Sequence, residues 1–269
     1  MTTTARSPQS PAKYSRQRQR IMLASGLLLL GLGLVIFLSL TNGSVALTGE
    51  ELFAAALRQG NPIHQTILWD LRLPRVLAAL VVGMALGLAG ALLQGMLRNG
   101  LASPFLLGIS AGAGLVVVLV VGVGLLRVWV PLGAWLGAII TTLMVYLLAR
   151  TGTTLSIERL VLGGVAFSSL FGAIQSLLLL LSSDGQIQAA LNWLIGSLNG
   201  RGWTEVRLVG PGIIAVSIAA CLIARQVNLL NLGDDLATGL GVSLVRSRCL
   251  IGAIATLLAA GAVSIAGLV

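Results

Sequence analysis

The chain has 269 residues, of which 57% are hydrophobic and only 9% are charged. Ordinary soluble domains carry charge on about 25% of their residues, so this composition excludes a soluble globular protein. Repeated long apolar stretches with few charges instead predict an all-α, polytopic transmembrane protein. The formal net charge of +9 gathers in the N-terminal tail and at the ends of apolar stretches, a distribution that indicates membrane topology and not nucleic-acid binding.

The N-terminal segment consists of a basic tail and a first apolar stretch. The tail, residues 1–20, offers no apolar face for packing, so we expect it to be disordered. The apolar stretch from Ile21 to Leu40 is longer than the core of a cleaved signal peptide, and no small-residue cleavage site follows it. We therefore expect a cytoplasmic tail over 1–20 and a retained transmembrane domain over 21–269. The basic residues next to the first span are Lys13, Arg16, Arg18 and Arg20.

Seven apolar stretches are long enough, or nearly long enough, to cross a bilayer. With the N-terminus in the cytoplasm, eleven of the 17 lysines and arginines fall on the cytoplasmic side and six on the outer side. This bias agrees with the excess of basic residues in cytoplasmic loops and supports that orientation. The predicted spans are 21–41, 76–97, 105–126, 130–149, 159–182, 206–226 and 249–269.

The connection between the first two spans contains one short amphipathic element, Gly49–Gln59. Acidic residues in its first turn and an arginine near its end suit the helix dipole, so we expect a short helix on the outer surface. His64 follows it and is the one histidine in the sequence, which favours a solvated loop residue over a metal ligand. Cys221 and Cys249 are expected to be inert thiols buried among helices.

The most patterned stretch runs from Arg72 to Gly114, RLPRVLAALVVGMALGLAGALLQGMLRNGLASPFLLGISAGAG. A proline-stiffened start with two arginines leads into an apolar run whose one strongly polar side chain is Gln94. That amide either faces a pathway or makes a buried interhelical hydrogen bond. A polar break, Arg98–Pro104, separates this run from the next span. Small residues at a spacing of four form one row on which a neighbouring helix can pack closely: Gly83, Gly87, Ala91 and Gly95.

Two later connections carry their own patterns. The run from Ala190 to Trp203 is too short and too polar to span, so it predicts a short interfacial helix anchored by Trp193 and Trp203. The run from Asn228 to Arg248 predicts two short helices separated by Gly233. Acidic residues follow that glycine, where they suit the N-terminus of the second helix. Taken alone, this second run is either an ordinary amphipathic connector or a docking element.

The ordered pattern from Arg72 onward resembles the signature region of FecCD/BtuC-type permeases, the membrane subunits of ABC importers for ferric siderophores, haem and cobalamin. That family has an R-x-P-R start, a glycine-rich helix, a glutamine, an R-N-P-L-A-x-P loop and a G-x-x-x-G-A start to the next helix. Gly100 departs from the pattern because the family usually has proline there, and it predicts a looser loop. The matching residues are Arg72–Arg75, Gly83–Gly90, Gln94, Arg98–Pro104 and Gly108–Ala113.

The resemblance implies roles for particular residues. Arg72 and Arg75 match arginines that receive acidic residues of a substrate-binding protein on the outer face. Asn99 and Leu101 match positions of a cytoplasmic gate, and Gln94 would lie on the pathway. The pattern N-x-L-x-L-G-x-x-x-A-x-x-L-G resembles the cytoplasmic element that seats in a cleft of the ATPase subunit. In this sequence its matching residues are Leu232, Gly233, Asp234, Asp235, Ala237, Leu240 and Gly241.

The sequence gives little support to an enzymatic function. A Walker A motif needs a lysine after glycine, whereas the one lysine, Lys13, precedes Tyr14. ATP hydrolysis is therefore expected in a separate chain. No HExxH or CxxC motif is present, and His64 lacks the context of a catalytic triad. The acidic residues lie near span ends or in loops, which disfavours a proton-coupled carrier. A sodium-coupled secondary transporter and a non-transporting assembly subunit remain as alternatives.

The family resemblance also implies the assembly. Such permeases have ten spans in two inverted repeats, so we expect a C-terminally truncated chain with about seven of them and an incomplete second repeat. It would act as a homodimer, or with a related permease, in the lipid bilayer of the bacterial inner membrane. ATPase subunits would bind inside and a substrate-binding protein outside. A ferric siderophore is the expected cargo, haem and cobalamin are alternatives, and no cofactor or metal is expected.

Overall fold

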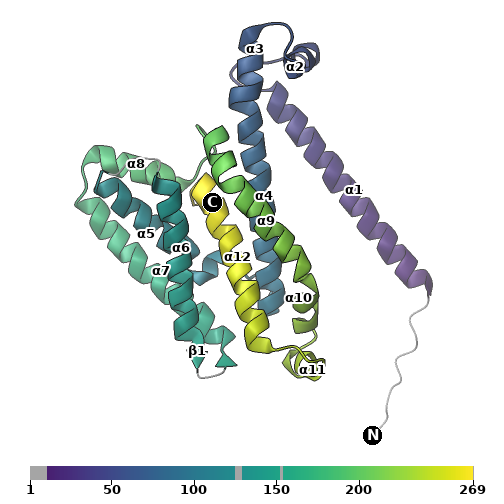
Figure 1. Cartoon of the computed structure of the whole chain (residues 1–269), viewed down its shortest axis with the longest axis vertical. Helices are drawn as coiled ribbons and strands as arrows, with labels where there is room; N and C mark the ends of the chain where they lie inside the picture. The colour runs from purple at the N-terminus through teal and green to yellow at the C-terminus, as the bar shows by residue number, and fades with distance from the viewer. Residues whose placement is uncertain (1–10, 125–128, 152–153, 269) are drawn as a thin grey trace. The chain divides into compact units, whose positions relative to one another are not determined.

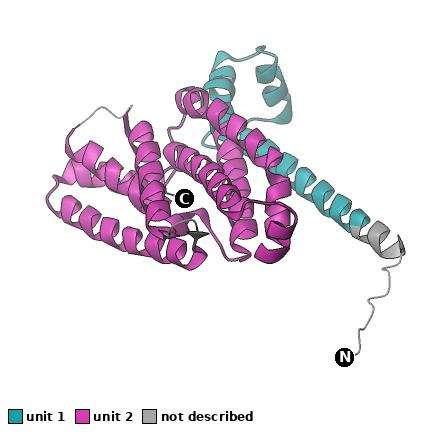
Figure 2. Cartoon of the chain, turned by 60° about the horizontal axis from the view of Figure 1, so that its bottom comes forward, with its two compact units in different colours: residues 1–76 teal, residues 77–269 magenta. Residues whose placement is uncertain are grey.

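The computed structural model describes residues 11–124, 129–151 and 154–268, and their regular structure is helical apart from one short hairpin (Figure 1). Contacts within the chain divide it into two compact units, Met1–Val76 and Leu77–Val269 (Figure 2). The division falls within α4 (Leu73–Leu97), and each unit is described separately below.

The first unit contains a long helix followed by three short helical segments. Thr48 begins α2 with a capping box, in which its hydroxyl accepts from the Glu51 amide at 3.3 Å and its own amide donates to the Glu51 carboxylate at 2.8 Å. The Trp69 indole donates to the carbonyl of Ala55 at 3.0 Å, which holds α2 against the π-helical turn η1. The elements are α1 (Pro11–Thr41), α2 (Gly49–Ala56), α3 (Pro62–Thr66) and η1 (Ile67–Arg72).

The structure confirms the predicted short helix but corrects the prediction for the tail. The predicted element Gly49–Gln59 is α2, which ends at Ala56. Helix α1 begins at Pro11, so residues 11–20 are helical and not disordered. The physical reason is that this stretch is rich in lysine, arginine and glutamine, which are good helix formers and extend the following apolar helix without a break. The rest of the predicted tail, residues 1–10, lies outside the described residues.

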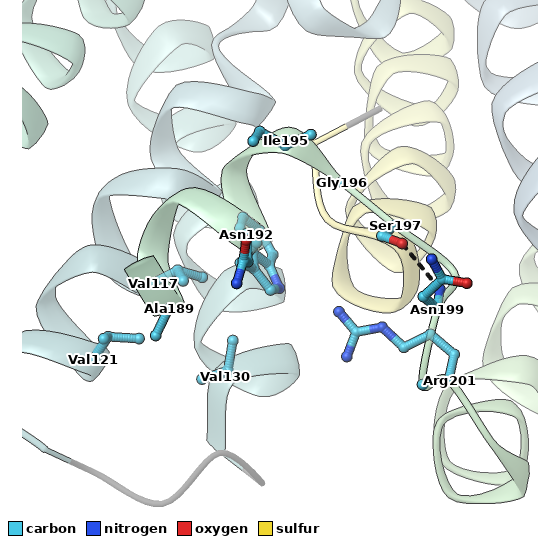
Figure 3. Close-up of a pocket in the computed structure, with 12 residues that line it drawn as sticks. Val117, Val121, Val130, Ala189, Asn192, Ile195, Gly196, Ser197, Asn199 and Arg201 are labelled. Atoms are coloured by element: carbon cyan, nitrogen blue, oxygen red, sulfur yellow. Dashed lines mark hydrogen bonds between the residues drawn. The ribbon is translucent and has the colours of Figure 1, made fainter. Parts of the chain in front are cut away.

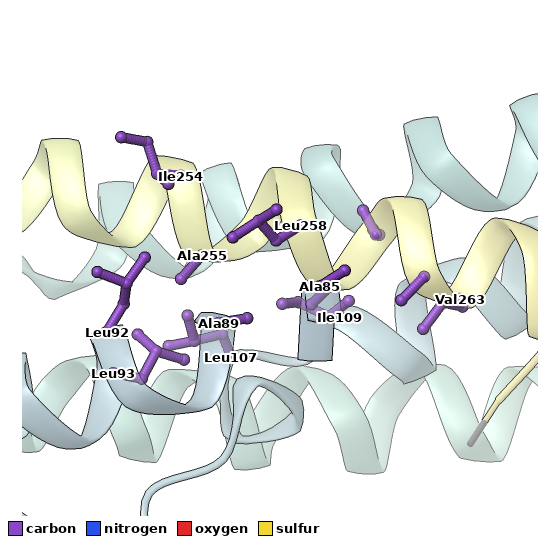
Figure 4. Close-up of a cluster of buried hydrophobic side chains, with 14 of the residues drawn as sticks. Ala85, Ala89, Leu92, Leu93, Leu107, Ile109, Ile254, Ala255, Leu258 and Val263 are labelled. Carbon is purple, nitrogen blue, oxygen red and sulfur yellow. The ribbon is translucent and has the colours of Figure 1, made fainter. Parts of the chain in front are cut away.

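The second unit is built around its last helix, α12. Nearly every residue of α12 from Ile251 to Ala266 is buried, and α5, α6 and α9 pack against it. Alanines and leucines of α4, with Leu107 and Ile109, also belong to this core (Figure 4). Besides α4, the elements are η2 (Pro104–Leu107), α5 (Ile109–Gly122), α6 (Trp129–Ala149), β1 (Arg150–Thr151), β2 (Thr154–Leu155), α7 (Ile157–Leu180), α8 (Asp184–Ile195), α9 (Trp203–Leu222), α10 (Ala224–Leu230), α11 (Asp234–Gly239) and α12 (Leu244–Ala266).

Each of the seven predicted spans overlaps a helix, although the sixth, 206–226, runs past the end of α9 at Leu222 into α10. Within the described residues, six helices are long and apolar enough to cross a membrane, and α5 is a shorter apolar helix. The third span is shorter than predicted because Pro104 starts a 3-10 turn that ends at Gly108, whose φ of +74° breaks the helix. Residues 125–126 of that prediction lie outside the described residues. The seventh span begins at Leu244, before its predicted start at 249.

The predicted interfacial helix is wrong in its bounds and in the role of its tryptophans. The helix is α8, and it begins at Asp184 because Ser183 and Gln186 form a capping box. It ends at Gly196, against which the carbonyl of Leu268 packs so closely that a side chain would not fit. Trp193 is buried, with 7% of its surface exposed, and Trp203 is the first residue of α9. Trp193 is therefore a buried residue of α8, Trp203 belongs to the next helix, and the position of α8 at a membrane surface stays a prediction.

Helices α5 and α6 contact each other closely through two glycines. A Cβ placed on Gly112 would lie 2.6 Å from the carbonyl oxygen of Gly137, and one on Gly137 would lie 2.5 Å from that of Gly112. Thr141 completes the contact, and its hydroxyl donates to the Gly137 carbonyl at 2.7 Å. Small residues are required here because the two backbones touch.

Candidate functional site

The connector between α10 and α11 is held in place by a three-residue ion cluster. The Asp234 carboxylate accepts from Nη2 of Arg248 at 2.9 and 3.0 Å, one distance for each oxygen, and from Nη2 of Arg98 at 2.7 Å. Arg248 lies in α12 and is only 8% exposed, so its charge requires a paired acceptor. The cluster therefore joins the start of α11 to α12 and to the loop after α4.

The connector has the two-helix form that the sequence predicts. Gly233 separates α10 from α11 with a φ of +110°, a conformation that other residues rarely adopt. Asp234 and Asp235 occupy the first turn of α11, where a helix dipole favours negative charge. Ala237 is fully buried on the inner side of this helix. The connector also carries three exposed leucines: Leu232, Leu236 and Leu240.

The loop after α4 contains the two predicted gate residues. Asn99 organises it, because its side-chain oxygen accepts from the amide of Leu101 at 2.9 Å and its carbonyl accepts from the amide of Ala102 at 3.0 Å. Leu101 is 89% exposed. Arg98, just before Asn99, has a φ of +52°, which is uncommon for a residue other than glycine. The loop is therefore ordered, although Gly100 replaces the proline of the family pattern.

A cavity of about 660 Å³ lies between the end of α4, the end of α9 and helix α10. Two residues predicted for a pathway, Gln94 and Asn99, line the same cavity. Arg98, Asn228 and Asn231 add further polar groups to its lining, whereas Leu101 is not part of it. Gln94 is exposed within this chain.

The predicted row of small residues on α4 packs at only one of its four positions. Gly95 is buried, and a Cβ there would run into the side chain of Val227 in α10. Gly83, Gly87 and Ala91 are exposed, and a Cβ on either glycine would meet no atom within 4 Å. Within the described residues the rest of this row is therefore an open face, and close packing along it stays a prediction.

The two predicted docking arginines differ in their surroundings. The Arg72 guanidinium donates to the carbonyls of Leu40 and Val45, and also to that of Thr41 at 3.0 Å. It therefore caps the last turn of α1 and the segment after it. Arg75, one helical turn along, is exposed. Both arginines belong to the first unit.

Sequence reasoning did not identify a second cavity, of about 630 Å³, between α5, α6, α8 and the loop after α8 (Figure 3). Its polar lining includes Asn192, Asn199 and Arg201, and the Arg201 guanidinium lies 3.9 Å from the Glu205 carboxylate. Trp193 also lines it, and within the described part of the chain its indole nitrogen has no hydrogen-bond partner. The sequence does not predict this site, because its polar residues are divided between two elements and form no motif.

The potential metal ligands do not gather. Among the described residues no group of three histidine, cysteine or acidic side chains could hold a metal ion. His64 lies in α3, and its Nδ1 is 3.8 Å from the Glu51 carboxylate. Cys221 and Cys249 are free thiols and both are exposed, which corrects the expectation that they are buried. Both cysteines lie on helix faces that point away from the buried core.

Comparisons with known proteins agree with this architecture. A family model of the FecCD transport family matches residues 29–269. The ferric enterobactin permease FepG of Escherichia coli is 39% identical over 231 residues, which cover 85% of this chain and 69% of FepG. The hemin permease HmuU of Yersinia pestis is 34% identical over 94% of this chain and 76% of HmuU. The cobalamin permease BtuC of Halobacterium salinarum is 36% identical over 80% of this chain and 58% of BtuC.

A solved structure gives the same result. An ABC transporter of metal-chelate type, in an inward-facing conformation, superposes on the chain with a TM-score of 0.79 at 29% identity. The match covers 90% of this chain and 76% of that chain. The chain therefore belongs to the FecCD transport family and is a multi-pass permease subunit of an ABC importer.

Proposed function

We propose that this chain forms the translocation pathway of an ATP-driven importer in a bacterial inner membrane, with its N-terminus in the cytoplasm. ATPase subunits would dock on the connector around α11. Two features of the connector support this proposal. It exposes three leucines, Leu232, Leu236 and Leu240, and it is held in place by the ion pairs of Asp234. Exposed apolar side chains on a fixed element form a ready interface for a partner protein.

A substrate-binding protein would dock on the outer face of the importer. Arg75 supports this part of the proposal, because its exposed guanidinium is available to pair with a carboxylate of a partner. Arg72 contributes indirectly, since its hydrogen bonds to the carbonyls at the end of α1 hold in place the segment that precedes Arg75. A second permease copy, identical or related, would complete the pathway, and the open face of α4 with Gly83, Gly87 and Gln94 is the surface of this chain that we assign to it.

The cargo that we propose is a ferric siderophore. Support comes from the 39% identity with FepG, which exceeds the 34% with HmuU and the 36% with BtuC. Haem and cobalamin are the competing cargoes. The polar lining of the cavity near Gln94 provides amide groups that suit an oxygen-rich chelate without binding its iron directly.

Uptake by a deletion strain tests this function. The strain would be complemented with the wild-type gene and given radiolabelled ferric enterobactin, haemin or cobalamin separately. We expect uptake of the ferric siderophore to return, and to disappear when the partner ATPase carries a substitution in its Walker A lysine. Uptake that survives this substitution would contradict ATP coupling and favour a secondary transporter. Restored uptake of haemin or cobalamin alone would contradict the proposed cargo.

A further inference from the structure

The ion cluster around Asp234 contains two contacts of different character. In the contact with Arg248 the guanidinium is buried, because the Arg248 side chain is 9% exposed whereas that of Asp234 is 38% exposed, and one nitrogen, Nη2, reaches both carboxylate oxygens. The contact with Arg98 lies near the surface, since the side chains of Arg98 and Asp234 are each 38% exposed. Buried pairs are costly to break, whereas exposed pairs contribute little and break readily. Asp234 is therefore held firmly to α12 and reversibly to the loop after α4.

The reversible contact lies beside the cavity that contains the predicted pathway residues. Arg98 lines this cavity together with Asn99 and Gln94. Its backbone φ of +52° is sparsely populated for a residue other than glycine, and such conformations persist where surrounding contacts hold them. The pair with Asp234 is one such contact. Loss of the pair would release both the side chain of Arg98 and the strained start of the loop.

We propose that Asp234 is a positioning residue that couples the connector around α11 to the loop after α4, and that its contact with Arg98 forms and breaks during transport. The inference rests on the proposed function, because it requires an ATPase that moves α11. The buried pair with Arg248 keeps Asp234 moving with the start of α12. The exposed pair with Arg98 transmits that movement to Asn99, which lines the cavity, and to the exposed Leu101.

A labelling experiment on the assembled importer tests this inference without any cargo. Leu101, which is 89% exposed, would be replaced by cysteine in a chain that carries Cys221→Ser and Cys249→Ser. The purified complex with its ATPase subunits would react with a charged maleimide, with and without trapping by ATP and vanadate. In the parent complex we expect the labelling rate to differ between the two states.

Arg98→Gln is the main test variant, because Arg98 is half exposed and its loss leaves the buried pair intact. We expect it to shrink the difference in labelling rate by about 3- to 30-fold while the amount of bound ATPase stays unchanged. Arg98→Lys keeps the charge and should retain most of the difference. Arg246→Gln is the matched control, since Arg246 is an exposed arginine near Arg248 on α12. It should behave like the parent.

Asp234→Asn removes the same contact from the side of the carboxylate and provides an independent check. Asp184→Asn is its control, because Asp184, like Asp234, is the first residue of a short helix. Adding Arg98→Gln to Asp234→Asn should cause no further loss, since both remove the same contact. A full labelling response in Arg98→Gln, or equal damage from Arg98→Lys, would overturn the inference while leaving the proposed function in place. A parent chain that binds no ATPase would overturn the proposed function, and the inference with it.

Discussion

Two sets of glycines in this chain share a sequence pattern but differ in their surroundings. Gly112 and Gly137 bring the backbones of α5 and α6 into contact, and neither has room for a side chain. Gly83 and Gly87 lie four residues apart on α4, as Gly133 and Gly137 do on α6, yet a Cβ on Gly83 or Gly87 would meet nothing within 4 Å. The first set stabilises the chain itself, and the second leaves an open face. Glycine spacing therefore identifies surfaces suited to close packing, but does not say whether the same chain covers them.

The largest effect is expected at the closed contact. Gly137→Val would force a branched side chain against the carbonyl of Gly112, and overpacking of this kind typically costs about 1–3 kcal/mol. We expect the midpoint of thermal unfolding in detergent to fall by roughly 3–10 °C. Size-exclusion chromatography after a series of heating steps would measure it. A Gly137→Val protein as stable as the wild type would show that the two helices do not touch as described.

The matched change on the open face is Gly87→Val. It should alter the free energy of unfolding by no more than about 0.5 kcal/mol, because nothing lies where its side chain would go. If this face receives a partner, uptake should nevertheless fall. Destabilisation of the isolated chain equal to that of Gly137→Val would contradict the contrast between the two sets.

The next largest effect is expected at Arg72 and Arg75 of the first unit. Like the two sets of glycines, one of these arginines has partners within the chain and the other is exposed. Arg72→Ala removes donors from the carbonyls of Leu40, Thr41 and Val45, and because water can replace part of these bonds near the surface, we expect a net loss of about 1 kcal/mol. Arg75→Ala should be nearly neutral for stability, since Arg75 is exposed. Hydrogen exchange of the segment after α1 would distinguish them. Equal protection in both variants would contradict the capping role of Arg72.

Arg75 should instead matter for the partner. Arg75→Glu is expected to weaken binding of the substrate-binding protein by about tenfold or more, as reversal of an interfacial charge does. Surface plasmon resonance on the chain in nanodiscs would measure the affinity, with Arg207→Glu as a control at another exposed arginine of a helix start. An unchanged affinity would remove Arg75 from the docking surface.

The smallest effect is expected at the capping box of α2. Hydrogen bonds from the backbone and hydroxyl of Thr48 hold the pKa of the Glu51 carboxyl below its ordinary value. A carboxyl group with a lowered pKa in the folded state stabilises it above the unfolded pKa, and that contribution disappears as pH falls through the folded value. Protection of α2 amides from exchange should therefore drop between about pH 5 and about pH 3. The Glu51→Gln protein should lack this step, and a step of equal size there would contradict the assignment.

The fold was largely predictable because transmembrane helices follow from the length of apolar runs. The exceptions have local physical causes. Pro104 and Gly108 shorten the third span, and the contact of Gly196 with the carbonyl of Leu268 ends α8 before Trp203. The latter contact could not be predicted, because it joins residues that are distant in sequence.

The candidate site was predicted only in part, because it too depends on contacts between residues that are distant in sequence. The pattern around Gly233 correctly predicts the two short helices. The partners of Asp234 did not emerge, since Arg98 lies 136 residues away and Arg248 lies in another helix. Both arginines stood at the ends of predicted spans, where a basic residue is usually explained by topology alone. Only their placement beside one carboxylate reveals a further role.

The most direct test of the account is whether ATPase subunits bind the connector around α11. The chain, extracted in detergent from a strain that also produces its ATPase, would be captured by an affinity tag as the wild type and as Leu236→Asp. Leu236 is exposed, so this substitution should leave the fold intact. We predict that the ATPase is captured with the wild-type chain and that capture falls by about tenfold or more with Leu236→Asp, because a charge would enter an apolar interface. Equal capture by both proteins would contradict the account.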